Sequence, residues 1–177
     1  MLAVFAALTL ASTGVLSAQI TTGDLINSIV PATNAIDGAV TPRFVLPVHD
    51  QIYAGIASDV TVGLSIGMDT LHSWQSPNRK AAFTCQAIRD GAVLGISELL
   101  KLIVHRERPD MSDNMSWPSE HTMFAAASTG GPSLAFVIPI TIGTGAGRIM
   151  ANKHYLSDVL SGALIGSVSG HYTRFCQ

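Results

Sequence analysis

The stretch that decides the fold class runs from Ala81 to Val104 and reads AAFTCQAIRDGAVLGISELLKLIV. Its apolar residues recur at steps of three and four, the periodicity of one face of an α-helix. The residues on this face are Ile88, Ala92, Gly95, Ile96, Leu99, Leu102 and Ile103. Asp90, Ser97 and Lys101 lie on another face. The pattern predicts one long helix, and the charges inside it make it a poor lipid-exposed span.

The flanking sequence also favours helices. Residues 52–71 form an earlier helical candidate, and a last helix is expected to start near Leu156. The uncharged stretch 122–147 is interrupted by glycines and prolines, so it predicts two shorter helices. Residues 21–50 are rich in turn-forming residues and predict a loop with room for one short helix. No stretch alternates as a strand does, so we expect an all-α bundle of about five or six helices.

The bulk composition narrows the class of protein. The chain has 177 residues and a net charge of -2, so residues 19–177 are expected to form one domain without a nucleic-acid partner. Charged residues make up 12% of the chain, about half the usual share. Mean hydropathy is +0.37, which favours association with a membrane. The two cysteines form no metal or redox motif.

The first eighteen residues carry no charge and combine an apolar run with small residues. This pattern resembles a secretory signal peptide or an N-terminal anchor helix, although the basic start of a signal peptide is missing. Either interpretation places the rest of the chain outside the cytoplasm, in the membrane or in a periplasmic or secreted form. The expected location is therefore the cell envelope.

Two short polar segments in the second half are suited to binding an anion. Lys101 and Arg108 are seven positions apart, two helical turns, so both cations project from nearly the same face before Pro109 ends the helix. Pro118 suits the first turn of a helix. Ser119 then offers a hydroxyl beside backbone N–H groups at the positive end of the helix dipole. We expect both segments to contribute to a phosphate site.

A third polar segment adds a candidate nucleophile. Arg148 supplies a planar guanidinium for phosphate oxygens. His154 and Asp158 are four positions apart, so on a helical turn the carboxylate reaches the imidazole. A carboxylate on one ring nitrogen fixes the tautomer and leaves the other nitrogen free to attack. The combination predicts nucleophilic chemistry at histidine.

Together the patterns K-x6-R-P, P-S-x-H and R-x5-H-x3-D resemble the three-part signature of the type 2 phosphatidic acid phosphatase superfamily. This superfamily includes lipid phosphatases, bacterial acid phosphatases and vanadium haloperoxidases. The resemblance spans Lys101 to Asp158, about a third of the chain, and the first half is similar only as a helical scaffold. It implies an all-α phosphatase core of the phosphatase and haloperoxidase type.

The resemblance implies a role for each matched residue. Lys101, Arg108 and Arg148 would bind phosphoryl oxygens, and Ser119 and the backbone N–H of Glu120 would complete the site. The three cations and the backbone dipoles would carry the transition-state charge, so no metal or cofactor is expected.

The catalytic roles are implied in the same way. His154 would attack phosphorus and form a phosphohistidine, which water then hydrolyses. Asp158 would orient His154, and His121 would protonate the leaving group.

The sequence departs from the superfamily pattern at two positions: Glu120 replaces a glycine and Gly147 replaces a serine. A carboxylate about 6 Å from a phosphoryl charge costs on the order of 3 kcal/mol, whereas an outward one costs less than about 0.5 kcal/mol. We therefore expect Glu120 to point away from the site, toward Arg106, His105 or Lys153. An inward Glu120 would indicate an impaired enzyme or a phosphate binder.

The function that these residues favour is a metal-independent phosphatase acting on phosphomonoesters, with lipid phosphates or pyrophosphates as the favoured substrates and a membrane as partner. One alternative is a soluble, non-specific acid phosphatase acting on small phosphoesters. Another is a catalytically impaired phosphate- or lipid-binding membrane scaffold, because of Glu120. A vanadium haloperoxidase is disfavoured, because those enzymes are generally much larger than this chain.

Overall fold

The computed structural model describes residues 33–128 and 134–173, and every regular element in these ranges is helical. The expected signal or anchor segment, residues 1–18, lies outside the described residues. Residues 33–40 are helical and lead into the 3-10 helix η1 (Thr41–Arg43). The other elements are α3 (Val48–Gln75), α4 (Arg79–Val104), α5 (Glu120–Ala127), α6 (Leu134–Met150) and α7 (Leu156–Thr173). The expectation of an all-α bundle is confirmed.

The helices of the structure begin and end close to the bounds predicted from the sequence. α3 is longer at both ends than the expected 52–71, and α4 and α7 begin within two residues of their expected starts. The stretch 122–147 does form two helices, α5 and α6, but Pro139 lies inside α6 and does not separate them. α4 begins where the side chain of Asn78 accepts a hydrogen bond from the N–H of Ala81, at 3.3 Å.

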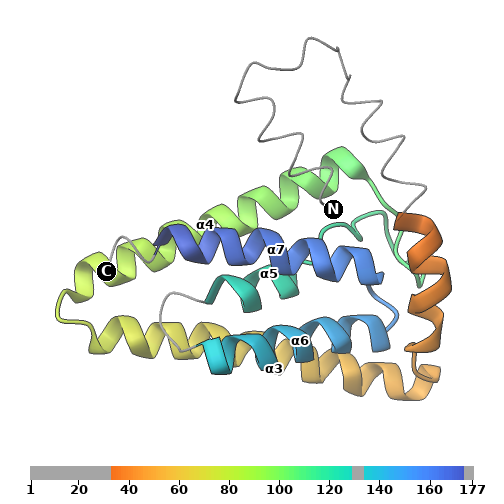
Figure 1. Cartoon of the computed structure of the whole chain (residues 1–177), viewed down its shortest axis with the longest axis horizontal. Coiled ribbons are helices and arrows are strands. Elements are labelled where there is room, and N and C mark those ends of the chain that lie inside the picture. The colour runs from red at the N-terminus through yellow and green to blue at the C-terminus, as the bar shows by residue number, and fades with distance from the viewer. Residues whose placement is uncertain (1–32, 129–133, 174–177) are drawn as a thin grey trace, which may run out of the picture.

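The short helix α5 lies at the centre of the bundle and contacts α3, α4, α6 and α7 (Figure 1). Its close packing against α7 depends on two glycines. A Cβ at Gly162 would stand 2.5 Å from the carbonyl oxygen of Ser119, and one at Gly166 would collide with the carbonyl oxygen of Met123. These glycines let the backbone of α7 approach the first turn of α5, which carries the predicted site residues.

The long helices α3 and α4 turn polar side chains inward and apolar ones outward. In α4 the buried positions include Arg89, Ser97 and Lys101. The apolar side chains predicted for one face of this helix include several exposed ones: Ile88, Ile96, Leu99, Leu102 and Ile103. The charges that make this stretch a poor lipid-exposed span are thus directed into the bundle or along its edge. Within the described ranges, no helix is both long enough and apolar enough to count as a membrane-crossing segment.

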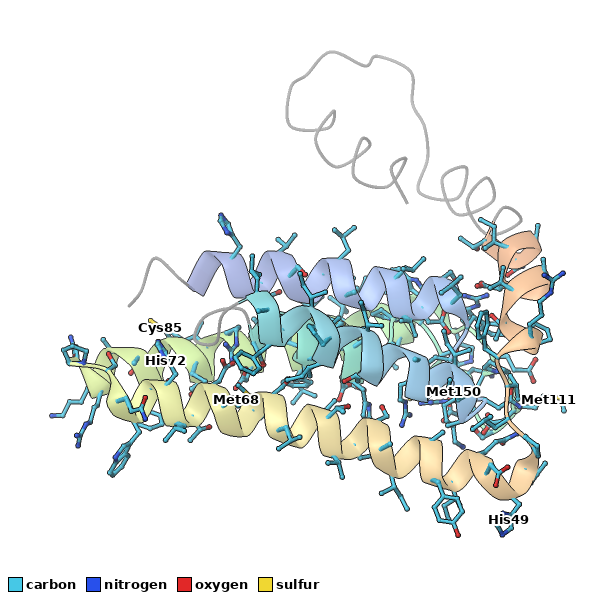
Figure 2. The ribbon with its side chains drawn as sticks, turned by 60° about the horizontal axis from the view of Figure 1, so that its bottom comes forward. His49, Met68, His72, Cys85, Met111 and Met150 are labelled. Carbon is cyan, nitrogen blue, oxygen red and sulfur yellow. The ribbon has the colours of Figure 1, made fainter. Side chains whose placement is uncertain are left out.

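The two ends of the bundle differ in content. Figure 2 shows Cys85 and His72 at one end of the α3–α4 pair, and Met111 and Met150 at the opposite end. Met111 belongs to the loop between α4 and α5, and Met150 ends α6. Because the predicted site residues come from these segments, the candidate site lies at the end opposite to Cys85.

Candidate active site

The three polar segments of the sequence converge at one end of the bundle. Arg108 lies in the loop after α4, His121 in the first turn of α5, Arg148 in the last turn of α6, and His154 in the loop before α7. Burial lowers the pKa of His154, and the positive charges of Arg148 and Arg108 lower it further. The pKa of His121 responds to the charges of Arg148 and His154. These groups are therefore within electrostatic range of one another.

His154 is buried, and a backbone group holds its ring. Its Nδ1 lies 2.7 Å from the carbonyl oxygen of Ser116 and 3.7 Å from Oδ2 of Asp158. A carbonyl only accepts, so Nδ1 carries the proton and Nε2 keeps its lone pair. A separation of 3.7 Å is too long for a hydrogen bond. The Ser116 carbonyl is therefore the direct hydrogen-bond partner of Nδ1, and Asp158 lies beside it at ion-pair distance.

Asp158 is fully buried in the first turn of α7, and both of its carboxylate oxygens are occupied. Arg106 donates to Oδ1 at 2.6 Å. The Ser116 hydroxyl and the backbone N–H of Tyr155 donate to Oδ2, at 2.5 and 2.9 Å. Asp158 is thus held next to His154, and its charge acts on the imidazole through space.

Ser119 precedes α5 as its N-cap and is fully buried. Its hydroxyl lies 3.0 Å from the hydroxyl of Thr122, and its N–H donates to the carbonyl of Asp158 at 3.0 Å. This second hydrogen bond ties the start of α5 to the start of α7. The structure thus brings Ser119 next to the His154 segment, with its hydroxyl already engaged.

Glu120 does not point away from the site. Its Oε2 lies 2.7 Å from Nζ of Lys101 and accepts a hydrogen bond from Ser97 at 3.2 Å. The expected outward orientation toward Arg106, His105 or Lys153 is wrong. The physical reason is that Lys101 is buried in α4, and a buried ammonium requires counter-charges.

The charge state of Glu120 follows from this pair. Burial by itself would raise the pKa of Glu120, but the hydrogen bond and charge of Lys101 bring it below its usual value. Lys101 is also paired with Glu98 at 2.7 Å. At neutral pH Lys101, a predicted phosphate ligand, is therefore paired with two carboxylates.

The two arginines predicted to bind phosphate are paired in the same way. Arg108 Nε lies 2.6 Å from Oδ1 of Asp113, and Arg148 NH1 lies 3.4 Å from Oδ1 of Asp59. Among the described side chains, Arg148 also has a buried Nε without a hydrogen-bond partner. The site therefore contains a donor group that an anion would satisfy.

Asp59 is a site residue that the sequence did not single out. It comes from α3, and its Oδ1 lies 3.0 Å from Nε2 of His121 as well as next to Arg148. The signal in the sequence is weak, because Asp59 is one of three acidic residues in a helix that contains no Lys or Arg. Its partners are more than sixty positions away, so spacing does not reveal the contact.

His121 lies between opposing electrostatic effects. Burial, followed by the charge of Arg148, lowers the pKa of His121 from 6.5 to about 4, while Asp59 acts to raise it. His121 is therefore neutral at pH 7 in this state. A bound phosphate would add negative charge nearby and favour the protonated ring.

Gly147, one of the two departures from the predicted signature, has a packing reason. A Cβ at Gly147 would stand 2.9 Å from the carbonyl oxygen of Ala54 and 3.0 Å from Cβ of Ser58. α6 approaches α3 too closely there for a side chain. This close approach brings Arg148, the next residue, toward Asp59 on α3.

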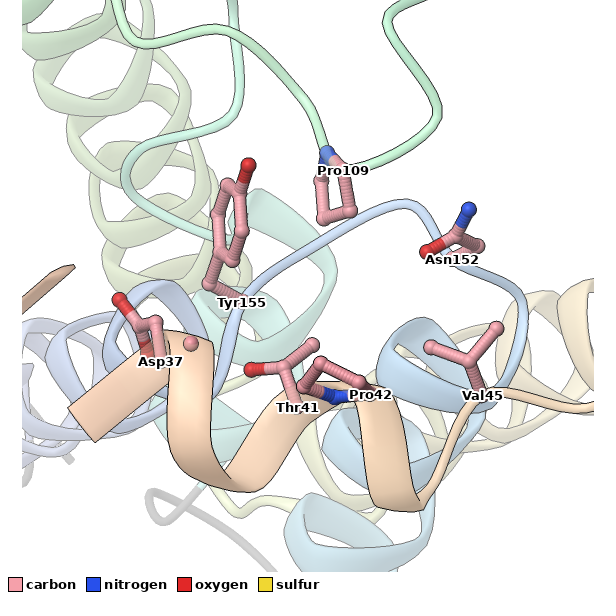
Figure 3. A pocket seen from close by; sticks show the side chains of 8 residues that line it. Asp37, Thr41, Pro42, Val45, Pro109, Asn152 and Tyr155 are labelled. Carbon is pink, nitrogen blue, oxygen red and sulfur yellow. The ribbon is translucent and has the colours of Figure 1, made fainter. Parts of the chain in front are cut away.

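A cavity of about 400 Å³ lies beside this site. Its lining residues are Asp37, Gly38, Thr41, Pro42, Val45, Pro109, Asn152 and Tyr155. Figure 3 shows Tyr155 and Pro109 facing Thr41 and Pro42 across it. None of the predicted phosphate ligands lines the cavity, although Pro109 directly follows Arg108 and Tyr155 directly follows His154. The three predicted cationic ligands, Lys101, Arg108 and Arg148, are each engaged in ion pairs.

The chain was also compared with known proteins. No protein-family model matches it, and neither a curated protein nor a solved structure does. The assignment of function therefore depends on the residues and on their geometry.

Proposed function

We propose that this chain is a metal-independent phosphatase of the type 2 phosphatidic acid phosphatase class, which hydrolyses phosphomonoesters through a phosphohistidine. The observation that carries the proposal is the state of His154. Its Nδ1–H is held by the Ser116 carbonyl, which leaves Nε2 unprotonated. The lone pair of Nε2 lies in the electrostatic field of Arg108 and Arg148. A neutral histidine with a fixed tautomer beside two guanidinium groups is suited to attack a phosphoryl group.

The reaction takes two steps. Nε2 of His154 forms a bond to phosphorus while the phosphorus–oxygen bond to the alcohol breaks, and His121 gives a proton to the leaving oxygen. Water then attacks phosphorus and passes a proton to His121, while the phosphorus–nitrogen bond breaks. Positive charge from Arg108 and Arg148 stabilises the equatorial oxygens in both steps.

Binding of a phosphate requires the existing ion pairs to rearrange. The phosphate takes the unsatisfied Nε of Arg148 and competes with Asp59 for the same guanidinium. It also competes with Glu120 for Lys101. The carboxylates on the three cations are partly exposed, so they move into water when the substrate binds.

The outer surface of the long helices favours a lipid substrate. α3 exposes Ile52, Ile56, Val60, Leu64 and Leu71, and α4 exposes Ile88, Leu94, Leu99, Leu102 and Ile103. Each apolar side chain of this size gains about 1.5–3 kcal/mol when it is fully removed from water. An apolar surface of this extent marks an interaction surface. We propose that it contacts membrane lipid, that the protein works in the cell envelope, and that the substrate is a lipid phosphate or pyrophosphate.

The test is a phosphate-release assay in EDTA with phosphatidic acid, phosphatidylglycerophosphate, an isoprenyl pyrophosphate and p-nitrophenyl phosphate. Full-length protein is expected to release phosphate, fastest from a lipid substrate. His154→Ala is expected to lose at least a thousandfold in kcat/KM. The matched control is His72→Ala, an exposed histidine at the opposite end of the bundle, which keeps wild-type rates. Equal activity of His154→Ala and wild type would contradict the proposal.

A second candidate, a phosphate- or lipid-binding protein without turnover, is favoured by the ion pair of Glu120 with Lys101. It predicts saturable binding of phosphatidic acid vesicles with no phosphate release on any substrate of the panel. A soluble acid phosphatase, in contrast, would release phosphate fastest from p-nitrophenyl phosphate. The same assay therefore separates the three functions.

A further inference from the structure

Arg106 is the most extensively bonded cation near the site, and the superfamily signature assigns it no role. It lies in the loop after α4, two residues before Arg108. Its NH1 donates to Oδ1 of Asp158 at 2.6 Å, and its NH2 donates to Oδ2 of Asp37 at 2.7 Å. Arg106 therefore bridges two buried carboxylates, one from α7 and one from the helical residues 33–40.

Further contacts fix the guanidinium in place. NH1 also donates to the hydroxyl of Ser157 at 2.7 Å, and NH2 donates to the side chain of Asn34 at 3.3 Å. The guanidinium carbon lies 4.1 Å from the ring centroid of Tyr155, a cation–π contact. With hydrogen bonds at both terminal nitrogens and one face against an aromatic ring, Arg106 has little freedom to turn toward a substrate.

Arg106 reaches His154 by two routes. One runs through Asp158, whose Oδ2 lies 3.7 Å from Nδ1 of His154. The other runs through the backbone, because the N–H of Ser116 donates to the carbonyl of Arg106 at 2.9 Å, and Nδ1 of His154 donates to the carbonyl of Ser116. The Ser116 hydroxyl closes the loop by donating to Asp158. Arg106, Ser116 and Asp158 form a frame behind the imidazole.

The charge of Arg106 also determines how strongly Asp158 attracts the imidazole proton of His154. A buried carboxylate without a partner would attract the imidazole proton strongly at short range. With Arg106 on Oδ1, the charge of Asp158 is largely compensated. The Nδ1–H of His154 then stays with the neutral carbonyl of Ser116. This keeps Nε2 unprotonated and directed away from the frame.

We propose that the Arg106 side chain positions the nucleophile: by holding Asp158, which accepts a hydrogen bond from Ser116, it fixes the orientation and tautomer of His154. This inference rests on the proposed phosphatase activity. It assigns Arg106 a task different from that of Arg108 and Arg148, because Arg106 acts through its neighbours and does not bind the phosphate.

The test compares Arg106→Gln and Arg106→Lys with wild type by the pH profile of kcat/KM, by kcat, and by the inhibition constant of inorganic phosphate. Without the cation, Asp158 favours the imidazolium, so the acidic limb of the Arg106→Gln profile shifts to higher pH by at least half a unit. Arg106→Lys keeps the charge but not the geometry, so its limb stays near that of wild type while kcat falls at least fivefold. Phosphate inhibition changes less than threefold in both, because the phosphate ligands are intact.

Arg79→Gln is the matched control. Its guanidinium stacks on Trp74 at the start of α4, at the opposite end of the bundle, and wild-type kinetics are expected. Wild-type kcat and an unshifted limb in both Arg106 variants would overturn the inference. A large loss of phosphate inhibition would also overturn it, because it would make Arg106 a phosphate ligand. If Arg106→Gln does not fold, the inference is tested by Arg106→Lys alone. A fall in its kcat of at least fivefold supports the inference, and a wild-type kcat overturns it. Absence of phosphate release by wild type would instead mean that the proposed function has failed.

Discussion

Apart from the pairs that Arg106 makes with the buried Asp37 and Asp158, the charged pairs at the two ends of the bundle differ in how far water reaches them. At the end opposite to the site, the side chains of Arg89 and Asp69 are each only 3% exposed. At the site end, the carboxylates on the phosphate ligands are more accessible: Glu120 is 23% exposed, Glu98 and Asp113 are 46% exposed and Asp59 is 60% exposed. Enclosed pairs are costly to break, whereas exposed pairs contribute little and are readily replaced. The first pair belongs to the scaffold, and the others are suited to displacement by an anion.

The largest expected effect concerns the enclosed pair. Arg89→Met leaves the charge of Asp69 uncompensated between α3 and α4, because Arg89 NH2 lies 2.6 Å from Oδ2 of Asp69. We expect the free energy of unfolding to fall by about 3–5 kcal/mol, measured by urea denaturation. Asp113→Asn, which breaks an exposed pair at the site end, is the control and costs less than about 1 kcal/mol. Equal losses in the two variants would remove the distinction between the ends.

The next largest effect concerns how the free energy of unfolding depends on pH. The pKa of His121 is lowered to about 4 by burial and Arg148, and burial also lowers the pKa of His154. Below pH 6.5 the unfolded chain therefore binds protons that the folded chain does not. The free energy of unfolding falls as pH drops from about 6.5 toward 4, by on the order of 2 kcal/mol for partly exposed His121.

The measurement is a series of urea titrations between pH 7.5 and 4.5. His121→Asn is expected to flatten the curve, because the substituted side chain does not titrate. His72→Asn changes an exposed histidine at the other end and leaves the slope unchanged. Stability that rises as pH falls through this range would contradict the assigned burial of the site histidines.

A third effect tests whether the carboxylate of Glu120 competes with substrate. Glu120→Gln removes the negative charge that faces Nζ of Lys101. It keeps the size of the side chain and the backbone N–H of residue 120. We expect kcat/KM to rise about tenfold, equal to about 1.4 kcal/mol, mainly through a lower KM. Glu107→Gln, an exposed acid in the loop after α4, is the control. Unchanged or lower kcat/KM in Glu120→Gln would show that the pair with Lys101 is structural and is not displaced.

The smallest expected effect concerns Asp59. Asp59→Asn removes the carboxylate that acts to raise the pKa of His121. The protonated form of His121 then becomes rarer, so kcat falls about threefold at pH 7 and the basic limb of the kcat profile shifts to lower pH. Asp50→Asn, at the exposed N-terminal end of α3, provides the comparison. A basic limb that does not move would show that Asp59 has no influence on proton transfer by His121.

The sequence predicts the parts of this molecule that depend on local patterns. The periodicity of residues 81–104 and the glycines and prolines near position 131 define α4 and the boundary between α5 and α6. The resemblance to a known three-part signature, and not local spacing, predicts that Arg108, Arg148 and His154 converge. The helices follow from local preferences, whereas the convergence depends on a pattern that runs from Lys101 to Asp158.

The features that the sequence does not predict depend on long-range packing. The orientation of Glu120 follows from the burial of Lys101, and that burial follows from which face of α4 turns inward. A hydropathy pattern identifies two faces but does not say which one is buried when the outside is apolar. The Ser116 carbonyl that holds His154 is a backbone group, so no residue type marks it. Asp59 meets His121 only after α3 has packed against α5.

The most direct test of the account is to trap the covalent intermediate. Full-length protein is mixed for milliseconds with a phosphate-labelled lipid substrate, quenched in alkali, in which phosphohistidine is stable, and digested for peptide mapping. The account predicts label on the peptide that contains His154, no label in His154→Ala, and more label at the same substrate concentration in Glu120→Gln. Rapid phosphate release by wild type without label on His154, or with label on another residue, would contradict it.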